Sequence, residues 1–194
     1  MVNVAVFVSG GGTNLQALVD ARDRGELPSV NLVLVISDNP SAYALKRAEA
    51  AGIAAKVIPG RGREFEEKAV EALTEAGVQV IVLAGFMKIL SREFVCRYEN
   101  RIINIHPSLI PSFCGEGYYG LKVHEAALKY GVKVSGATVH FVNEIPDGGK
   151  IIMQKAVDVM ADDTPESLQK RIMEQAEWVI LPRALEKVCS ELKG

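Results

Sequence analysis

Short runs of β-branched and aliphatic residues alternate with helix-like patterns through the first hundred residues, and this alternation constrains the fold most. The apolar runs predict strands at 3–8, 31–36, 54–58, 78–85 and 101–105. The segments between them predict helices at 14–25, 42–52, 63–77 and 91–98. Gly25, Gly52 and Gly77 stand where helix C-termini favour a residue that tolerates the left-handed conformation. Near-continuous apolar strands separated by helices indicate a parallel sheet covered on both faces.

The second half of the chain has a different pattern. A helix is predicted at 121–131, followed by strands at 133–142 and 149–159. The connection "NEIPDGG" is too short for a parallel crossover, so these two strands should form an antiparallel hairpin. A last helix is expected over 162–188, with Thr164 as N-cap, Pro165 in its first turn and a kink or break at Pro182.

These patterns together predict an α/β fold: a Rossmann-like, open twisted sheet, mainly parallel, with an antiparallel C-terminal hairpin and helices on both faces. A chain of 194 residues is within the range of one domain. We therefore expect a single domain over 1–194.

The composition excludes several classes of protein. A net charge of −2 provides no excess of positive charge for a nucleic-acid backbone. Three cysteines without a CxxC pair argue against a disulfide framework or a zinc site, and no cluster has metal-ligand spacing. No apolar run reaches the length of about 18 residues that a membrane span needs. We expect a soluble cytoplasmic protein without a metal.

The stretch "VSGGGTNLQ" at 8–16 places three glycines between a strand and a helix. Glycines allow a ligand to approach the backbone, and the free amides of a helix N-terminus attract anions. The stretch is not a P-loop, because no lysine follows the glycines, and Leu15 occupies the third glycine position of a dinucleotide-binding motif. A monophosphate site fits better than a pyrophosphate site, and a simple tight turn remains the alternative.

The stretch "NIHPSLIPSF" at 104–113 places an asparagine and a histidine where a buried strand ends, between two prolines. Ligands bind at the carboxyl ends of strands in open α/β sheets, so His106 is the favoured catalytic histidine. His124 and His140 are interpreted as packing residues. Asp147 lies at the tip of the predicted hairpin, and the spacing leaves open whether it reaches His106.

Five segments in this order resemble the phosphoribosylglycinamide formyltransferase family of the folate-dependent formyltransferases. They are "SGGGTNLQ", "LAGFMKIL", "NIHPSLIPSF", "GATVHFV" and "DGGKIIMQ", and the resemblance covers essentially the whole chain. It implies transfer of a formyl group from 10-formyltetrahydrofolate to phosphoribosylglycinamide in purine synthesis. It also implies a phosphoribosyl-binding half over 1–100 and a catalytic, folate-binding half over 101–194, in a protein that is a monomer or a homodimer.

The resemblance assigns roles to particular residues. The catalytic group would be Asn104, His106 and Asp147. The phosphoribosylglycinamide would be held by Gly12, Thr13, Asn14, Leu15, Gln16 and Glu177. The folate would be held by Arg63, Met87, Lys88, Ile89, Leu90, Asn104, Asn143, Glu144, Ile145, Pro146 and Asp147. Gly11, Lys88 and Trp178 depart from the residues that many relatives carry at these positions.

The implied reaction is direct acyl transfer, in which the amine attacks the formyl carbon and a tetrahedral intermediate forms. Asn104 and a protonated His106 would donate hydrogen bonds to the negatively charged oxygen. A carboxylate raises the pKa of a neighbouring histidine, so we expect Asp147 to raise the pKa of His106. The flanking prolines would limit the freedom of the loop that carries the pair.

Other functions remain open on the sequence alone. A formyltetrahydrofolate deformylase or a methionyl-tRNA formyltransferase uses the same folate, although each normally carries an additional domain. A binding module for a phosphosugar or a folate would keep the fold without catalysis. A dinucleotide-dependent dehydrogenase is disfavoured, because the third glycine is missing.

Overall fold

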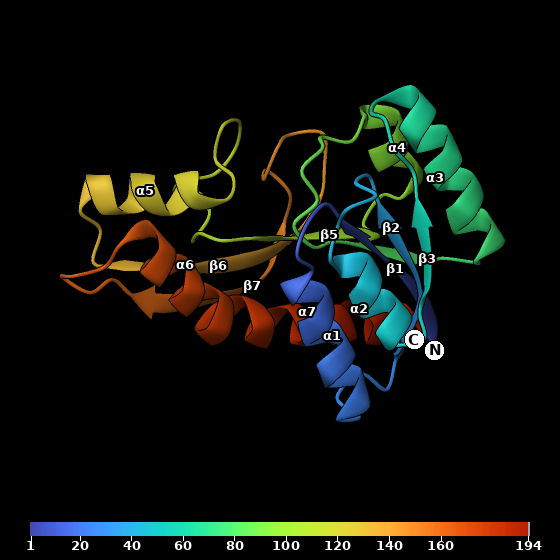
Figure 1. Cartoon of the computed structure of the whole chain (residues 1–194), viewed down its shortest axis with the longest axis horizontal. Coiled ribbons are helices and arrows are strands. Elements are labelled where there is room, and N and C mark those ends of the chain that lie inside the picture. Colours follow the sequence, from blue (N-terminus) through green and yellow to red (C-terminus); the bar gives the residue numbers. More distant parts are fainter. Residues whose placement is uncertain (194) are drawn as a thin grey trace.

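A computed structural model describes residues 1–193, which form an α/β fold around one mixed sheet (Figure 1). The strands in the described residues are β1 (Val2–Val8), β2 (Val30–Ser37), β3 (Ala54–Val57), β4 (Val80–Leu83), β5 (Ile102–His106), β6 (Val134–Phe141) and β7 (Ile151–Asp158). Their order across the sheet is β3-β2-β1-β4-β5-β6-β7. The first five run parallel, whereas β6 is antiparallel to both β5 and β7. The predicted mainly parallel sheet with an antiparallel hairpin is confirmed.

The helices connect the strands as the sequence predicted. They are α1 (Thr13–Asp23), α2 (Ala44–Ala50), α3 (Arg63–Glu75), α4 (Arg92–Arg97), α5 (Leu121–Tyr130), α6 (Pro165–Ile172) and α7 (Trp178–Glu191). Gly25, Gly52 and Gly77 adopt φ values of 75°, 67° and 60°, so the predicted left-handed helix ends are confirmed. The strand predicted at 78–85 is shorter than expected, because β4 ends at Leu83 and the chain then turns away from the sheet.

The two faces of the sheet are covered by different helices. Along β1, Val4, Val6 and Val8 belong to one apolar cluster, and Ala5 and Phe7 belong to the other. The first cluster includes residues of α1, α2, α5, α6 and α7, and the second includes residues of α3 and α4. The alternation of side chains along a strand therefore builds two cores, and burial of both faces holds the parallel strands together.

The prediction of a helix kinked or divided at Pro182 was wrong in its position. A π-helical turn, Met173–Glu177, separates α6 from α7, and Pro182 lies inside α7 without ending it. The missing N–H of Pro182 would have bonded to the carbonyl of Trp178, the first residue of α7. The proline therefore costs only the first bond of that helix. Thr164 caps α6 as predicted and accepts a hydrogen bond from the Ser167 amide.

The order of the strands marks where a ligand should bind. Strands β1 and β4 lie side by side in the middle of the sheet. From β1 the chain continues to β2 on one side, and from β4 it continues to β5 on the other side. Ligands of open α/β sheets bind in the crevice at such a switch point, outside the carboxyl ends of the strands. Within residues 1–193 no helix is both long and apolar enough to cross a bilayer.

Candidate active site

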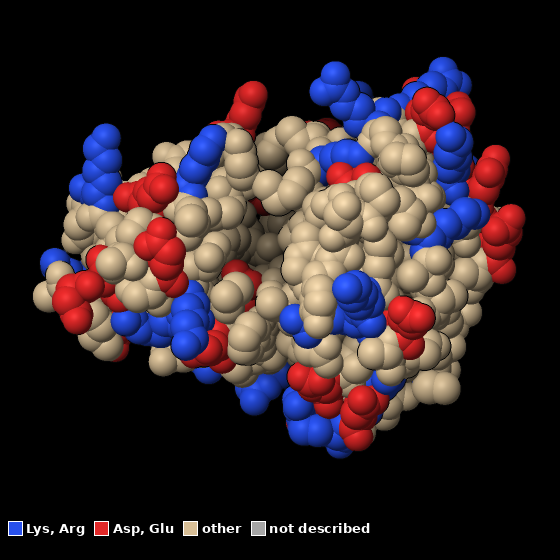
Figure 2. All heavy atoms as spheres, in the orientation of Figure 1, with Lys and Arg blue, Asp and Glu red and all other residues tan. Residues whose placement is uncertain are grey.

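A cavity of about 730 Å³ opens at the carboxyl ends of β1, β4 and β5. Its walls come from both halves of the chain: the start of α1, the segment after β4, the loop between β5 and α5, the β6–β7 connection and the π-helical turn. Figure 2 shows a hollow in the middle of this face, between the side that carries α5 and the side that carries α1 and α2. The volume suits a small molecule of drug size or larger.

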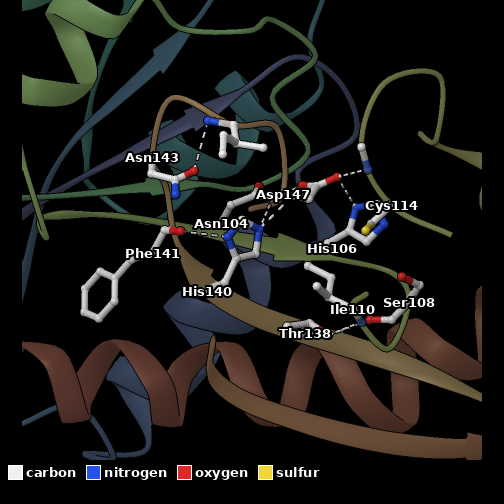
Figure 3. A network of polar contacts seen from close by, with 12 residues as sticks. Asn104, His106, Ser108, Ile110, Cys114, Thr138, His140, Phe141, Asn143 and Asp147 are labelled. Atoms are coloured by element: carbon white, nitrogen blue, oxygen red, sulfur yellow. Dashed lines mark hydrogen bonds and ion pairs between the residues drawn. The ribbon is translucent and has the colours of Figure 1, made fainter. Parts of the chain in front are cut away.

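Asn104 and His106 lie two residues apart on β5, so their side chains leave the same face of the sheet. Both line the cavity. The antiparallel strand β6 places His140 directly opposite Asn104, and Asn104 Nδ2 lies 3.2 Å from His140 Nε2 (Figure 3). The other ring nitrogen of His140 lies 2.8 Å from the carbonyl oxygen of Phe141. Both ring nitrogens of His140 are therefore engaged, Nδ1 with the Phe141 carbonyl and Nε2 with the side chains beside β5.

Asp147 reaches this pair from the β6–β7 connection, which answers the question that the spacing left open. Its carboxylate lies 3.5 Å from His106 Nδ1, 3.5 Å from His140 Nε2 and 3.5 Å from Asn104 Nδ2 (Figure 3). The amide of Gly115 donates to Oδ2 over 2.8 Å. Asp147 adopts φ 55°, an uncommon value for a residue other than glycine. The turn is therefore shaped to direct this carboxylate inward.

Burial alone would raise the pKa of Asp147. The hydrogen bond with His140, the nearby His106 and the Gly115 amide outweigh burial and hold the pKa of this carboxyl below its usual value. Asp147 is therefore a carboxylate at neutral pH, set among three groups that can donate hydrogen bonds to it or share a proton with it.

The expectation that Asp147 raises the pKa of His106 above its ordinary value was wrong. Burial lowers the pKa of His106, and Asp147 and the Phe113 carbonyl oppose this shift without cancelling it. The residue is 5% exposed, and Nε2–H donates to the carbonyl oxygen of Phe113 over 2.9 Å. The pKa of His106 therefore lies below its ordinary value, and because Nε2 is engaged with Phe113, Nδ1 beside Asp147 is the nitrogen at which a proton can be gained or lost.

Hydrogen bonds hold the loop after β5, in addition to the prolines that the sequence suggested. Thr138 Oγ1 donates to the Ser108 carbonyl over 2.6 Å and accepts from the Ile110 amide over 3.1 Å (Figure 3). Gln154 Nε2 donates to Thr138 Oγ1 and to the Ile110 carbonyl. Side chains of β6 and β7 therefore fix the backbone that follows His106.

The residues expected to hold the ribonucleotide are only partly together. Thr13, Asn14 and Glu177 line the cavity. Leu15 is fully buried in the apolar core, so only its backbone could meet a ligand. Gln16 faces a second, smaller cavity of about 290 Å³, whose wall also includes Thr13.

Gly12 has a structural role in the same loop. It adopts φ 72° at the start of α1, and a Cβ at this position would lie 2.6 Å from the Cβ of Ala44. Only glycine therefore permits both this backbone conformation and the close approach of α2.

Glu177 is the most perturbed carboxyl of the site. Asn14 Nδ2 donates to its Oε2 over 2.7 Å, which favours the charged form, but burial dominates and raises the pKa of Glu177 to about 7. Asn14 Oδ1 is buried without a hydrogen-bond partner among the described residues. A buried acceptor that lines a cavity and lacks a partner indicates a ligand that donates, such as a hydroxyl.

The residues expected to hold the folate line one side of the cavity, with one exception. Met87–Leu90 and Asn143–Asp147 all contribute to its wall. Met87, Ile89 and Ile145 are 54%, 75% and 61% exposed, so apolar surface faces the opening and suits a flat heterocycle. Arg63 does not line the cavity: its side chain is 85% exposed and pairs with Glu67 over 2.9 Å.

Lys88, which is part of this wall, also connects three loops. Its Nζ lies 3.0 Å from Asp38 Oδ2, 5.1 Å from the ring centroid of Phe65, and within contact of the Gly60 carbonyl. The loops after β2, β3 and β4 are therefore joined through one ammonium group.

The sequence reasoning missed two buried histidines of the cavity wall, His124 and His140. His140 would have been found had the register of β5 against β6 been known. His124 is 1% exposed, both of its ring nitrogens lack partners within residues 1–193, and burial lowers its pKa to about 4. Burial raises the pKa of the Cys114 thiol, so this cysteine is protonated at neutral pH.

Comparison with known proteins identifies the class. Residues 2–185 match the family described as Formyl transferase, and the chain belongs to this family. It is 45% identical over 193 residues to the trifunctional purine biosynthetic protein adenosine-3 of Gallus gallus, which covers 97% of this chain. The chain spans 18% of the length of that relative.

Two further comparisons are more specific. The chain is 40% identical over 186 residues to phosphoribosylglycinamide formyltransferase of Haemophilus influenzae, covering 94% of this chain and 84% of that protein. The fold superposes with a TM-score of 0.91 on glycinamide ribonucleotide transformylase 1 from Symbiobacterium toebii. That comparison has 40% identity and covers 98% of this chain and 89% of that one.

Proposed function

We propose that this protein is a phosphoribosylglycinamide formyltransferase, which transfers the formyl group of 10-formyltetrahydrofolate to the amine of phosphoribosylglycinamide. The observation that carries the proposal is the convergence of Asp147 on Asn104 and His106 at one end of the large cavity. The membership of the formyl transferase family and the similarity to proteins named for this activity support it.

The two substrates are assigned to opposite sides of the cavity. The ribonucleotide would bind near the start of α1, with Thr13, Asn14 and Glu177. Its ribose hydroxyls can donate to Asn14 Oδ1 and to the Glu177 carboxylate. The folate would bind between 87–90 and 143–147, where exposed apolar side chains offer a slot for its ring.

His106 then acts as the general base. The amine attacks the formyl carbon and a C–N bond forms. The bond between this carbon and the folate nitrogen then breaks, and the folate nitrogen receives the proton that His106 took from the amine. His106 can take the proton that the amine loses at Nδ1, because it lines the cavity, its pKa lies below the ordinary value and Nε2 is engaged with the Phe113 carbonyl. The imidazolium that results is stabilised by Asp147 at 3.5 Å and by the Phe113 carbonyl at 2.9 Å. This differs from the initial expectation of a histidine already protonated.

Asn104 is assigned to the developing oxyanion. Its Nδ2 has two hydrogens: the one directed at His140 over 3.2 Å orients the amide, and the one that meets Asp147 only over 3.5 Å is available to the oxyanion. A donor of this kind contributes about 2.7–4 kcal/mol to stabilisation of the transition state. Both strands of the β5–β6 pair therefore hold the donor in place before the substrate arrives.

The remaining expectations follow the same proposal. Residues 1–100 and 101–193 share one sheet, and each of these two parts contributes residues to both proposed substrate sides. We propose a single domain that acts on two small molecules in the cytoplasm, as a monomer or a homodimer, without nucleic acid or membrane partners.

The test is an assay of the purified protein with 10-formyltetrahydrofolate, with and without phosphoribosylglycinamide, following the absorbance of the deformylated folate. Turnover that requires the ribonucleotide is expected. Turnover without it would support a deformylase, and folded protein with no turnover would support a binding module. His106→Asn should lose more than about tenfold in rate. A smaller loss would remove His106 from the mechanism.

A further inference from the structure

Arg47 of α2 contacts the glycine loop from outside the large cavity. Its Nε–H donates to the carbonyl oxygen of Gly11 over 2.9 Å, and its Nη1–H donates to Gln16 Oε1 over 2.9 Å. The guanidinium carbon lies 5.1 Å from the ring centroid of Tyr43. One side chain therefore joins the loop before α1 to the first turn of that helix, and the Tyr43 ring limits its freedom.

The backbone of α2 reinforces this contact. The Ala44 amide donates to the Gly10 carbonyl over 3.1 Å, and Ala44 lies against Gly12 so closely that no Cβ fits. Helices α1 and α2 are neighbours in the fold (Figure 1). The conformation of residues 10–13 is therefore set by α2, because each of Gly10, Gly11 and Gly12 has a direct contact with it.

The charge around Arg47 points to an anion. Arg47 and Arg24 both line the small cavity. Arg24 is paired with Glu26 over 2.7 Å, whereas no carboxylate of residues 1–193 lies within 4.0 Å of the Arg47 guanidinium. The N-terminus of α1 has no side-chain cap and no acidic residue in its first turn. Asp20 also lines the small cavity, but it reaches Arg47 only through Gln16, whose Nε2 donates to Asp20 Oδ1 over 2.8 Å. The free amides of α1 and a guanidinium without a direct carboxylate partner together favour an anion beside Thr13, a residue that lines both cavities.

We propose that Arg47 is a positioning residue for the phosphate-bearing substrate. It holds the 10–13 loop in the conformation that presents its amides, and it adds a fixed positive charge behind them. This inference rests on the proposed function, since it assigns the phosphate of the ribonucleotide to this loop. Arg47 does not line the large cavity, so it acts through the loop rather than by contact with the reacting atoms.

Steady-state kinetics on the full chain test the proposal, with each substrate varied while the other is saturating. Arg47→Gln should raise the KM for phosphoribosylglycinamide roughly tenfold or more, while the KM for 10-formyltetrahydrofolate stays within about twofold. The increase of the ribonucleotide KM with salt should be shallower in Arg47→Gln than in the wild type, because a positive charge has been removed. Arg47→Lys keeps the charge and should recover part of the affinity.

Lys46→Gln is the matched control. Lys46 is the next residue of α2, carries the same charge and lies 5.8 Å from the same Tyr43 ring, but lines neither cavity. It should leave both KM values unchanged. An unchanged ribonucleotide KM in Arg47→Gln, an equal rise in both KM values, or an unchanged salt dependence would overturn the proposal. If Arg47→Gln does not fold, Arg47→Lys is tested instead: a ribonucleotide KM equal to that of the wild type, or an equal rise in both KM values, would then overturn the proposal, because lysine lacks the planar fork that bonds Gly11 and Gln16.

Failure of the proposed function would be seen separately. If the wild type shows no transfer to phosphoribosylglycinamide, calorimetric titration with ribose 5-phosphate still tests the role of Arg47. Weaker binding by Arg47→Gln than by Lys46→Gln would support it. Equal binding by both variants, or no binding by the wild type, would refute it.

Discussion

Replacing Asp147 by asparagine tests the central electrostatic argument, because the side chain keeps its shape and loses its charge. The carboxylate lies 3.5 Å from His106 Nδ1, the nitrogen that becomes protonated in the proposed mechanism. Two unit charges at this separation attract by roughly 5 kcal/mol at an effective dielectric constant of about 20. The Asp147 side chain is 15% exposed, and the amide dipole of asparagine replaces part of the attraction. A net loss of roughly 2–3 kcal/mol remains, which lowers kcat/KM about 10²-fold.

The pH dependence of kcat/KM gives an independent test, because the direction of its shift in Asp147→Asn is also expected. His106 must be neutral to act as the base, so kcat/KM falls as the pH drops through its pKa. Burial lowers this pKa and Asp147 opposes the shift. Without the carboxylate, burial acts with less opposition, so the pKa falls further and the acid limb of the profile moves to lower pH.

The assay is the same absorbance change, measured over a range of pH for the wild type, Asp147→Asn and Glu125→Gln. Glu125 is an exposed carboxylate on α5 that lines neither cavity, and its loss should leave the profile unchanged. An acid limb that stays in place or moves to higher pH in Asp147→Asn would refute the coupling between Asp147 and His106. A rate within about threefold of wild type would refute the transition-state argument.

Three further changes have defined outcomes. Gly12→Ala should destabilise the protein by about 1–3 kcal/mol in urea denaturation, because Cβ would meet Ala44 at φ 72°. Gly10→Ala, with nothing within 4 Å of its Cβ, is the control. Asp38→Asn should raise the KM for folate by up to about tenfold and spare the ribonucleotide KM, because Lys88 loses its 3.0 Å partner. The pKa of His124 is about 4 when folded and 6.5 when unfolded, so the unfolded chain binds its proton first and stability falls as the pH drops. In urea denaturation, the free energy of unfolding of the wild type should therefore fall between about pH 7.5 and about pH 5 by about 2 kcal/mol more than that of His124→Leu.

The sheet and its helices were predictable because each strand carries its own apolar pattern and each helix its own end signals. Gly25 and Gly77 marked helix ends because glycine tolerates the left-handed conformation that both adopt. The short "NEIPDGG" connection required an antiparallel pair of strands. The position of the helix break was not predictable from Pro182, because a proline near the start of a helix removes little. The π-helical turn at Met173–Glu177, where the break lies, contains no proline or glycine that would have predicted it.

The site was predictable where it depends on one element and not where it depends on several. Asn104 and His106 share β5, so their spacing alone puts them on one face. His140 joins them only through the register between β5 and β6. The sign of the His106 pKa shift required knowledge of burial, since an adjacent carboxylate and desolvation act in opposite directions. Arg63 turned outward to Glu67, which a motif cannot reveal.

The π-helical turn at Met173–Glu177 lets two helices be packed independently of each other. Leu168 and Ile172 fix the rotation of α6 about its axis, and Leu181 and Leu185 fix that of α7, within the same core. A wide turn holds one more residue than an α-helical turn, so it absorbs the difference in phase between the two helices. Glu177 thereby faces the large cavity while its neighbour Trp178 faces the small one. An ordinary α-helical turn in its place would rotate α7 relative to α6, so one of the two helices would lose its fit to the core and the two cavities would lose one of their walls.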